Sequence, residues 1–314
     1  MIMNMHMAPK KVPGTANILK ISRPYAMWSV FYNCRVFRLS NGAYYAIDVS
    51  TRGYVPGFGT FSKDALTWAN SRPPFVCRNS VKTCLLNGYF YYITAEQQNA
   101  GSSTSAIIYS LSRFDGSSWT NIPAPNVWNN TGGDQSGVLP TILFTFGNDI
   151  YMGLANGDIY KYTPGDGSWY KQSITHSFGN NASKRYINWN DAVYIEFMAS
   201  GISDGNTWYK FTPSQGFTEF DTTPNTGGLF VKNGLLHKIE LFTVQGNKRY
   251  YKIYKYINGA FEEIGSTNAI GNGADFSAMR HVMTKEQGPI FWGSMTTLGN
   301  YPTMNVDLIY ELVI

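Results

Sequence analysis

Charged residues are scarce in this sequence: only 14% of its 314 residues are Asp, Glu, Lys or Arg. The formal net charge is +5, and the basic residues are scattered singly apart from Lys10-Lys11 and Lys248-Arg249. A protein that binds nucleic acid usually presents a clustered basic footprint. We therefore expect no nucleic-acid partner.

Cysteines and long apolar runs are also scarce. The three cysteines, Cys34, Cys77 and Cys84, show no Cys-x-x-Cys spacing, so we expect free thiols rather than a zinc site or a disulfide framework. No run reaches the roughly 18 apolar residues that a membrane-spanning helix needs. The first residues, MIMNMHMAPKKVPG, contain no apolar core of a signal peptide. We expect neither a membrane span nor a signal peptide.

Residues arranged for known chemistry are missing as well. The four histidines, His6, His176, His237 and His281, are far apart with no paired spacing. No Gly-x-Ser-x-Gly elbow, phosphate-binding glycine loop or His-Glu-x-x-His motif occurs. The sequence predicts no catalytic residue, no metal and no cofactor, and hence a protein that is not an enzyme.

Aromatic residues and glycine, by contrast, are abundant: 16% of residues are Phe, Trp or Tyr, and 31 are glycine. This composition favours many short strands joined by tight turns. No long segment has a helical period.

The sequence repeats itself roughly every 45 to 50 residues. The segments SRFDGSSWTNIP, YKYTPGDGSWYKQ, YKFTPSQGFTEF and YKYINGAFEEIG each join a basic-aromatic pair, a glycine-containing turn and a Trp or Phe that opens another strand. A second hairpin precedes each copy, as in LLNGYFYYITA and FTFGNDIYMGLA. The repeating unit is therefore two successive hairpins, which is four strands.

Four strands in such a unit are typical of a β-propeller blade. We predict an all-β fold with a single propeller of six four-stranded blades. The blades are expected at 34–75, 81–123, 141–175, 184–223, 228–267 and 276–314. The last blade lacks an outer strand, and residues 17–22 are expected to supply it and close the ring, since closure removes a free sheet edge. We expect residues 1–16 to form an N-terminal arm and residues 17–314 to form the propeller domain.

The turn before the outermost strand carries a recurring acid and a recurring ring. We expect these residues to be structural, because a large ring there can cover the outer flank of its blade. They are Asp64, Trp68, Asp115, Trp119, Asp166, Trp169, Phe217 and Phe261.

Two propeller families resemble this pattern. An aromatic, a short glycine turn and a tryptophan look like the Kelch repeat, although no Gly-Gly doublet follows the second strand. The segment SKDALTW, with Ser62, Asp64, Thr67 and Trp68, is similar to the Asp-box of sialidase-like propellers, with Ala65 where glycine is usual. The sialidase resemblance implies an arginine cluster and a Tyr nucleophile with a Glu partner, and no motif here matches that set.

Long connections are predicted to gather on one end of the propeller. They include 50–60, 96–105, 124–137 and 297–305, and they are polar with isolated aromatic residues. Loops that grow on one side of a rigid scaffold often carry function. The candidate binding residues are Tyr54, Phe58, Trp128, Asn129, Asn130 and Tyr301.

From these observations we expect a non-enzymatic binding or structural propeller, a phage or virion component such as a tail, fibre or capsid-associated protein. Its partners would be other protein subunits of an assembly, or a host-surface glycan or protein. The alternatives are a glycan-active enzyme of the sialidase or lyase type and a Kelch-type intracellular adaptor. The corresponding locations are the virion or the cytoplasm.

Overall fold

The structure, a computed structural model, is built from β-strands throughout the residues it describes. The described residues are 15–20, 34–38, 44–48, 59–62, 69–70, 83–98, 106–125, 130–131, 140–176, 183–198, 206–223, 228–245, 248–266, 280–284, 288–293 and 308–313.

These strands form antiparallel sheets in which neighbours in sequence pair with each other. The first sheet contains β2 (Cys34–Arg38), β3 (Tyr44–Asp48), β4 (Gly59–Ser62) and β5 (Ala69–Asn70). The second contains β6 (Thr83–Leu86), β7 (Tyr89–Gln98), β8 (Ala106–Phe114), β9 (Trp119–Pro123) and β10 (Asn130–Thr131). The third contains β11 (Pro140–Phe146), β12 (Asp149–Leu154), β13 (Asp158–Thr163) and β14 (Ser168–Thr175).

The remaining strands continue the same pattern. The fourth sheet contains β15 (Ser183–Trp189), β16 (Ala192–Met198), β17 (Asn206–Thr212) and β18 (Gly216–Thr223). The fifth contains β19 (Gly228–Lys232), β20 (Leu235–Gln245), β21 (Lys248–Ile257) and β22 (Ala260–Ser266). The sixth contains β23 (Arg280–Thr284), β24 (Gly288–Gly293) and β25 (Leu308–Val313), with β1 (Thr15–Lys20) beside β25.

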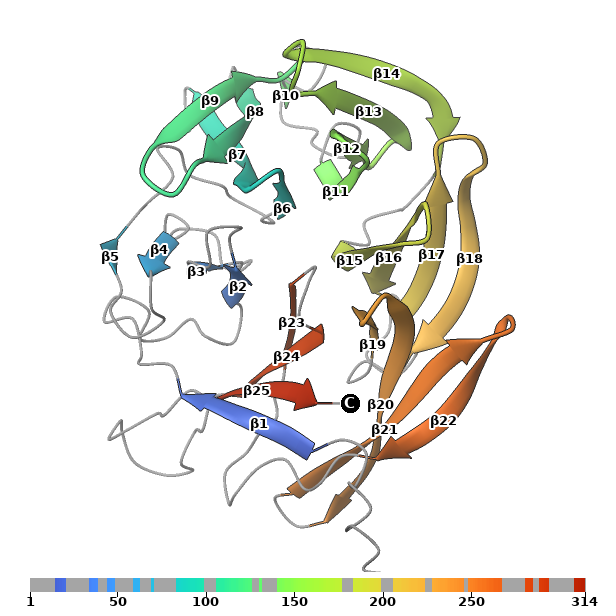
Figure 1. Ribbon diagram of the computed structural model, residues 1–314. Coiled ribbons are helices and arrows are strands. Elements are labelled where there is room, and N and C mark those ends of the chain that lie inside the picture. Colours follow the sequence, from blue (N-terminus) through green and yellow to red (C-terminus); the bar gives the residue numbers. More distant parts are fainter. Residues whose placement is uncertain are drawn as a thin grey trace, which may run out of the picture.

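The sheets are arranged around a common centre, with the first strand of each nearest to it (Figure 1). Strand β11 contacts β6 on one side and β15 on the other, β15 contacts β19, and β23 contacts β2. All-β composition and four-stranded antiparallel sheets are thus as predicted, and the second sheet departs from the prediction by one strand. There β9 pairs only with residues 110–114 of β8, so the edge of β8 at 106–107 is left for β10.

Strand β1 brings the two ends of the chain together. It pairs antiparallel with β25 from Thr15 opposite Val313 to Lys20 opposite Leu308. The strand begins two residues earlier than the expected segment 17–22.

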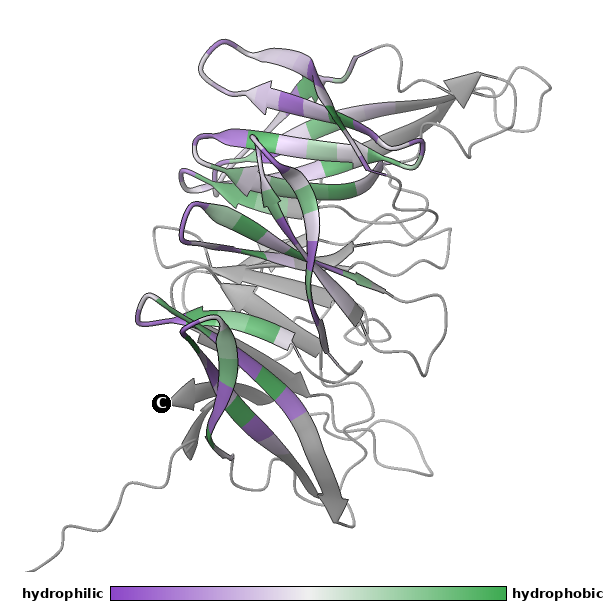
Figure 2. Ribbon diagram, turned by 90° about the vertical axis from the view of Figure 1, so that its right-hand side faces the viewer, coloured by the Kyte–Doolittle hydropathy of each residue, from purple (hydrophilic) through white to green (hydrophobic). Residues whose placement is uncertain are grey.

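The core lies between neighbouring sheets, because successive side chains of a strand point to opposite faces. On β12, Ile150 and Met152 pack against the second sheet, whereas Tyr151 packs against the fourth. On β16, Val193 packs toward the third sheet and Tyr194 toward the fifth. Both faces of these inner strands are therefore buried, while outer strands such as β14 alternate between half-buried and exposed residues. Figure 2 shows this alternation of hydrophobic and polar positions along the described strands.

In the second to fifth sheets, short turns join the first strand to the second and the third strand (β8 in the second sheet) to the fourth (β9), and in Figure 2 these turns gather at one end of the sheets. Asn233 and Gly234 join β19 to β20 with positive φ angles of 52° and 74°. Asn258 and Gly259 join β21 to β22 with 49° and 90°. Two successive positive φ angles define the type I′ turn, whose twist matches that of the flanking strands. We call this end of the molecule the short-turn end.

Replacing Gly234 by alanine should destabilise the protein by about 1–2 kcal/mol, because an L-residue is strained in the left-handed region. An added Cβ would meet no atom within 4 Å there, so backbone strain alone is tested. Gly165→Ala is the matched control, since its site is equally open but its φ is not positive. Urea denaturation of both variants measures the difference, and equal stabilities would contradict the argument.

Candidate functional site

The turn between β8 and β9 is organised by Asp115. Its Oδ1 accepts hydrogen bonds from the backbone N–H groups of Ser117 and Ser118, both at 2.7 Å, and its two oxygens also accept from both serine hydroxyls at 2.8 Å. These donors stabilise the charged carboxylate and hold the pKa of Asp115 well below its usual range. Asp115 is thus occupied within its own turn.

The tryptophan that follows this turn, Trp119, lies against rings of its own sheet. Its ring stacks on Phe114 at a centroid distance of 4.9 Å and meets Phe90 edge-on at 6.2 Å. The equivalent Trp169 tilts over Tyr162 at 4.9 Å, and its Nε1–H donates to the carbonyl oxygen of Pro123 at 3.0 Å. Trp169 therefore links the third sheet to the second.

The same position is held by phenylalanine in the next two sheets. The ring of Phe217 lies 4.7 Å from that of Phe211 and stacks with His176 at 5.0 Å. The ring of Phe261 lies 5.0 Å from that of Tyr256, and the ammonium of Lys238 lies over it at 4.8 Å.

The remaining repeat residues are partly placed. Asp166 accepts from the backbone N–H of Ser168 at 2.8 Å and from the Tyr170 hydroxyl at 3.0 Å, so it organises its turn as Asp115 does. The predicted repeat residues Asp64 and Trp68 lie outside the described residues.

A second set of equivalent positions lies beside these turns, one residue before the aromatic of each third strand. It consists of Arg113, Lys161, Lys210 and Lys255. Each lies opposite a residue of the second strand in its sheet: Tyr91, Tyr151, Tyr194 and His237 respectively. Burial is the main cause that raises the pKa of each of these three tyrosines to about 12, so they stay protonated at neutral pH.

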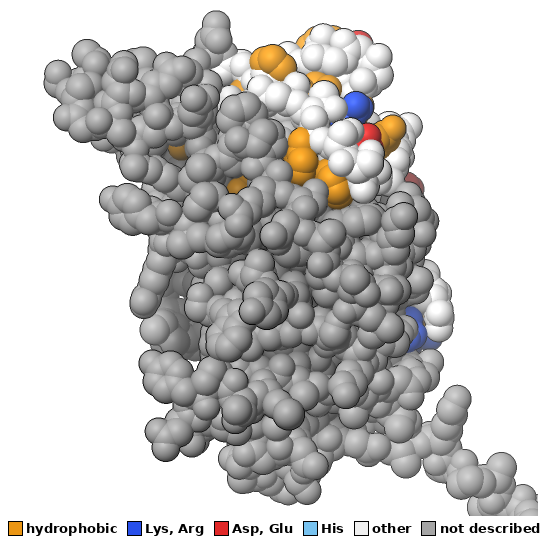
Figure 3. Space-filling view, turned by 90° about the vertical axis from the view of Figure 1, so that its left-hand side faces the viewer, with side chains coloured by type: hydrophobic (Ala, Val, Ile, Leu, Met, Phe, Trp, Pro, Cys, Tyr) orange, Lys and Arg blue, Asp and Glu red, His pale blue; other side chains and the backbone are white. Residues whose placement is uncertain are grey.

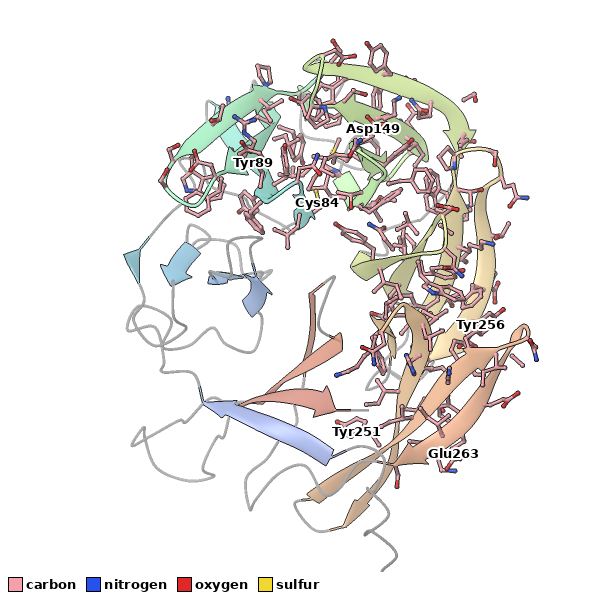
Figure 4. The ribbon with its side chains drawn as sticks, viewed as in Figure 1. Cys84, Tyr89, Asp149, Tyr251, Tyr256 and Glu263 are labelled. Atoms are coloured by element: carbon pink, nitrogen blue, oxygen red, sulfur yellow. The ribbon has the colours of Figure 1, made fainter. Side chains whose placement is uncertain are left out.

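The partner of this basic residue changes from sheet to sheet. In the third sheet, the Nζ of Lys161 lies 3.6 Å from Asp149, which also accepts from the Thr163 hydroxyl at 2.8 Å. In the second sheet, Tyr89 occupies the place of Asp149, and the guanidinium of Arg113 lies over its ring at 4.7 Å. Figure 4 shows Tyr89 and Asp149 on their adjacent sheets. Sequence reasoning missed this pair, although aligning the inner hairpins places Tyr89 and Asp149 in register.

The candidate residues of the long connections are mostly outside the described part of the chain. Tyr54, Phe58, Trp128, Asn129 and Tyr301 belong to that group. Asn130 is placed: it lies in β10, opposite Ile107 of β8. Because Gln98 of β7 pairs with Ala106, Asn130 sits at the end of the second sheet opposite its short turns.

The described residues offer no obvious place for a metal ion, since no group of three or more His, Cys, Asp or Glu side chains comes together among them. His176 follows β14 and His237 lies in β20, on different sheets. Cys84 is buried, and burial raises the pKa of its thiol well above the usual value. Within the same described part, no helix is both long and apolar enough to cross a bilayer.

Comparison with known proteins shows the fold and leaves the family open. No protein-family model and no curated protein matches the chain. A putative oxidoreductase (glucose dehydrogenase) from Thermus thermophilus is similar at a TM-score of 0.52 and 9% identity, over 95% of this chain and 100% of that one.

Two glycoside-processing proteins are similar at lower scores. A sialidase from Trypanosoma rangeli matches at a TM-score of 0.49 and 8% identity, over 95% of this chain and 58% of that one. The GH43 protein BlXynB from Bacillus licheniformis matches at 0.42 and 12%, over 77% and 57%. This chain therefore spans somewhat more than half the length of those two proteins. The likeness supports a sialidase-like β-propeller fold, whereas the Kelch resemblance stays a prediction.

The expected function as a non-enzymatic phage or virion component is wrong on this comparison. The similar structures named here are a GH43 protein, a sialidase and a putative oxidoreductase, and none of these three is a virion protein. The repeat describes the scaffold and carries no information about a partner. The glycan-related alternative fits the comparison better.

Replacing Trp169 by alanine should lower the free energy of unfolding by about 2–4 kcal/mol, because a half-buried ring and its bond to Pro123 are lost. The neighbouring Tyr170, which is 47% exposed, is the matched control. Tyr170→Ala should cost no more than about 1 kcal/mol. Chemical denaturation compares the two, and a similar cost for both would contradict a bracing role for Trp169.

Proposed function

We propose that this protein is a carbohydrate-active β-propeller whose sheets close into a single ring of six blades. The carbohydrate would bind at the end opposite the short turns. One observation carries the proposal: the turns between first and second strands and between third and fourth strands gather at one end (Figure 2), and the polar segments of the sequence fall between other strands, such as β3 and β4 or β7 and β8.

The pairing of β1 with β25 supports the closed ring. Without β1, the edge of β25 would carry unpaired N–H and C=O groups, which favour edge-to-edge association. The contact between β23 and β2 places the sixth sheet beside the first. A ring closed in this way has its first and last strands in one blade, so the two chain ends stabilise each other.

The ligand class is supported by two things. The segment 124–137 combines amide and hydroxyl side chains with Trp128, 50–60 combines hydroxyl side chains with Tyr54 and Phe58, and 96–105 is rich in amides and hydroxyls. Aromatic faces with nearby hydrogen-bonding groups suit a sugar. The structure similar at a TM-score of 0.52 is titled a glucose dehydrogenase, and we take from it only the class of ligand. Asn130, anchored on β8 at that end, is the described residue best placed to take part.

Three expectations from the sequence stay predictions: the absence of catalysis, protein subunits as partners, and the location in the cell. The Kelch-type adaptor remains the second candidate. An assay that measures both binding and turnover of glycans separates it from the proposal.

A panel of oligosaccharides, polysaccharides and fluorogenic glycosides tests the carbohydrate proposal. We expect at least one glycan to bind, and Asn130→Ala and Trp128→Ala to weaken its affinity by about tenfold each, the loss of roughly 1.4 kcal/mol. Asn148→Ala, in a short turn at the other end, is the control and should bind as the parent does. Calorimetry measures affinity and fluorescence measures turnover; binding of no glycan would contradict the proposal.

Deletion of residues 1–20, which removes β1, should lower the melting temperature strongly, because β25 then loses its whole pairing partner. Deletion of residues 1–14 keeps β1 and is the matched control. Thermal melting followed by circular dichroism compares the two proteins. Equal melting temperatures would show that β1 does not close the ring.

A further inference from the structure

Arg113 is set apart from its counterparts by its surroundings at the seam between the second and third sheets. Its guanidinium lies over the ring of Tyr89, and it donates a hydrogen bond to the hydroxyl of Tyr91. Tyr162 of the third sheet lies close enough for the charge of Arg113 to act on it. The arginine thus lies beside two tyrosines of its own sheet, and its charge also acts on Tyr162 of the third sheet.

No carboxylate of the described residues pairs with this arginine. Lys161, at the same position one sheet further, has Asp149, and Tyr89 stands where that aspartate would be. An arginine side chain has five N–H donors, and the Tyr91 hydroxyl is the acceptor found for them in the described part of the chain. The Nε–H is buried there without an acceptor. Among the described residues, the charge of Arg113 is therefore neutralised by no carboxylate, and its Nε–H has no acceptor.

The immediate surroundings suit a protein partner. Tyr89, the ring that Arg113 lies over, is 36% exposed. Figure 3 shows hydrophobic side chains beside basic and acidic ones over the described part of the neighbouring side of the molecule. Tyr, Trp and Arg are the residues enriched where protein interfaces concentrate their binding energy, and guanidinium groups bind carboxylates through paired hydrogen bonds.

We propose that Arg113, with Tyr89 beside it, forms a binding site for the carboxylate of an acidic protein segment at the short-turn end of this seam. The site lies at the end opposite the proposed carbohydrate site and does not rest on that proposal. Charge complementarity indicates the occupant. In the third sheet the equivalent basic residue, Lys161, is paired with the carboxylate of Asp149. Arg113 has no such partner among the described residues, so an external carboxylate would fill that role.

The internal repeat also supplies the sharpest test. Tyr89→Asp would give Arg113 the same kind of partner that Lys161 has in Asp149, so it should block the site while leaving the fold intact. A short glutamate-rich peptide and its glutamine counterpart are the probes. We expect the glutamate peptide alone to bind, with an affinity that falls as salt is raised.

Arg113→Gln and Tyr89→Asp should each weaken peptide binding by roughly tenfold or more, as the loss of a charge-assisted contact implies. Arg113→Lys keeps the charge but not the paired donors. Its affinity for the peptide should lie between that of the parent and those of Arg113→Gln and Tyr89→Asp. Lys210→Gln, at the same position in the fourth sheet, is the control and should bind normally. Thermal melting of each variant checks folding, and Tyr89→Asp carries the test if Arg113→Gln fails to fold.

Parent-like binding by Tyr89→Asp, or equal binding of the two peptides, would overturn the proposal. An acidic oligosaccharide that displaces the peptide and binds more tightly would overturn the choice of a protein segment as occupant. Because Asn130 lies at the other end of the second sheet, the carbohydrate variant Asn130→Ala should leave peptide binding unchanged.

Discussion

The structure depends on burying both faces of each sheet against its neighbours. Successive residues of an inner strand point to opposite sides, and in β12 and β16 both sides are apolar. A sheet of this kind cannot leave one face in water without exposing a large apolar area, at roughly 25 cal/mol per Å². It must therefore be packed between two others, as the third sheet is between the second and the fourth, and the fourth between the third and the fifth.

Tryptophan side chains fill the space between packed sheets and also form hydrogen bonds there, which aliphatic side chains cannot do. Trp169 and Trp189 fill space at the seams while their indole N–H groups donate to the carbonyl oxygens of Pro123 and Gly234 on the adjoining sheets. Trp208, fully buried, donates to the Thr223 hydroxyl of its own sheet. A large apolar body with one polar atom thus joins separate sheets without leaving that atom unsatisfied. This explains why so aromatic a composition accompanies so few charges.

The repeated positions form a constant frame on which single residues vary. The position that begins the second strand holds Tyr89, Asp149, Ala192 and Leu235 in four successive sheets. Tyr89 and Leu235 are exposed at this position, which follows directly on a hairpin turn, where packing constrains side chains less than in the core. The repeated strands can therefore keep the same fold while the side chain at this exposed position differs from one sheet to the next.

Much of this organisation was predictable from the sequence. The Asn-Gly and Gly-Asn turns and the regular spacing of hairpins predicted antiparallel four-stranded units, because such turns act locally and need no knowledge of the remaining chain. Strand β10 was not predicted, since two residues carry no periodicity. Nor was the function: the comparison overturned the virion interpretation, because a repeat describes the scaffold and not what it binds.

The sequence by itself determined the strand order, the turn types and the propeller class, all of which follow from contacts between near neighbours in the chain. Only the tertiary structure decided which groups meet across the seams: the Trp169 indole with the carbonyl of Pro123, Lys238 with Asp221 at 3.3 Å, and the Trp189 indole with the carbonyl of Gly234. The physical reason is distance. Partners far apart in the chain come together only when whole sheets pack, and the angle and register of that packing are set by many side chains at once.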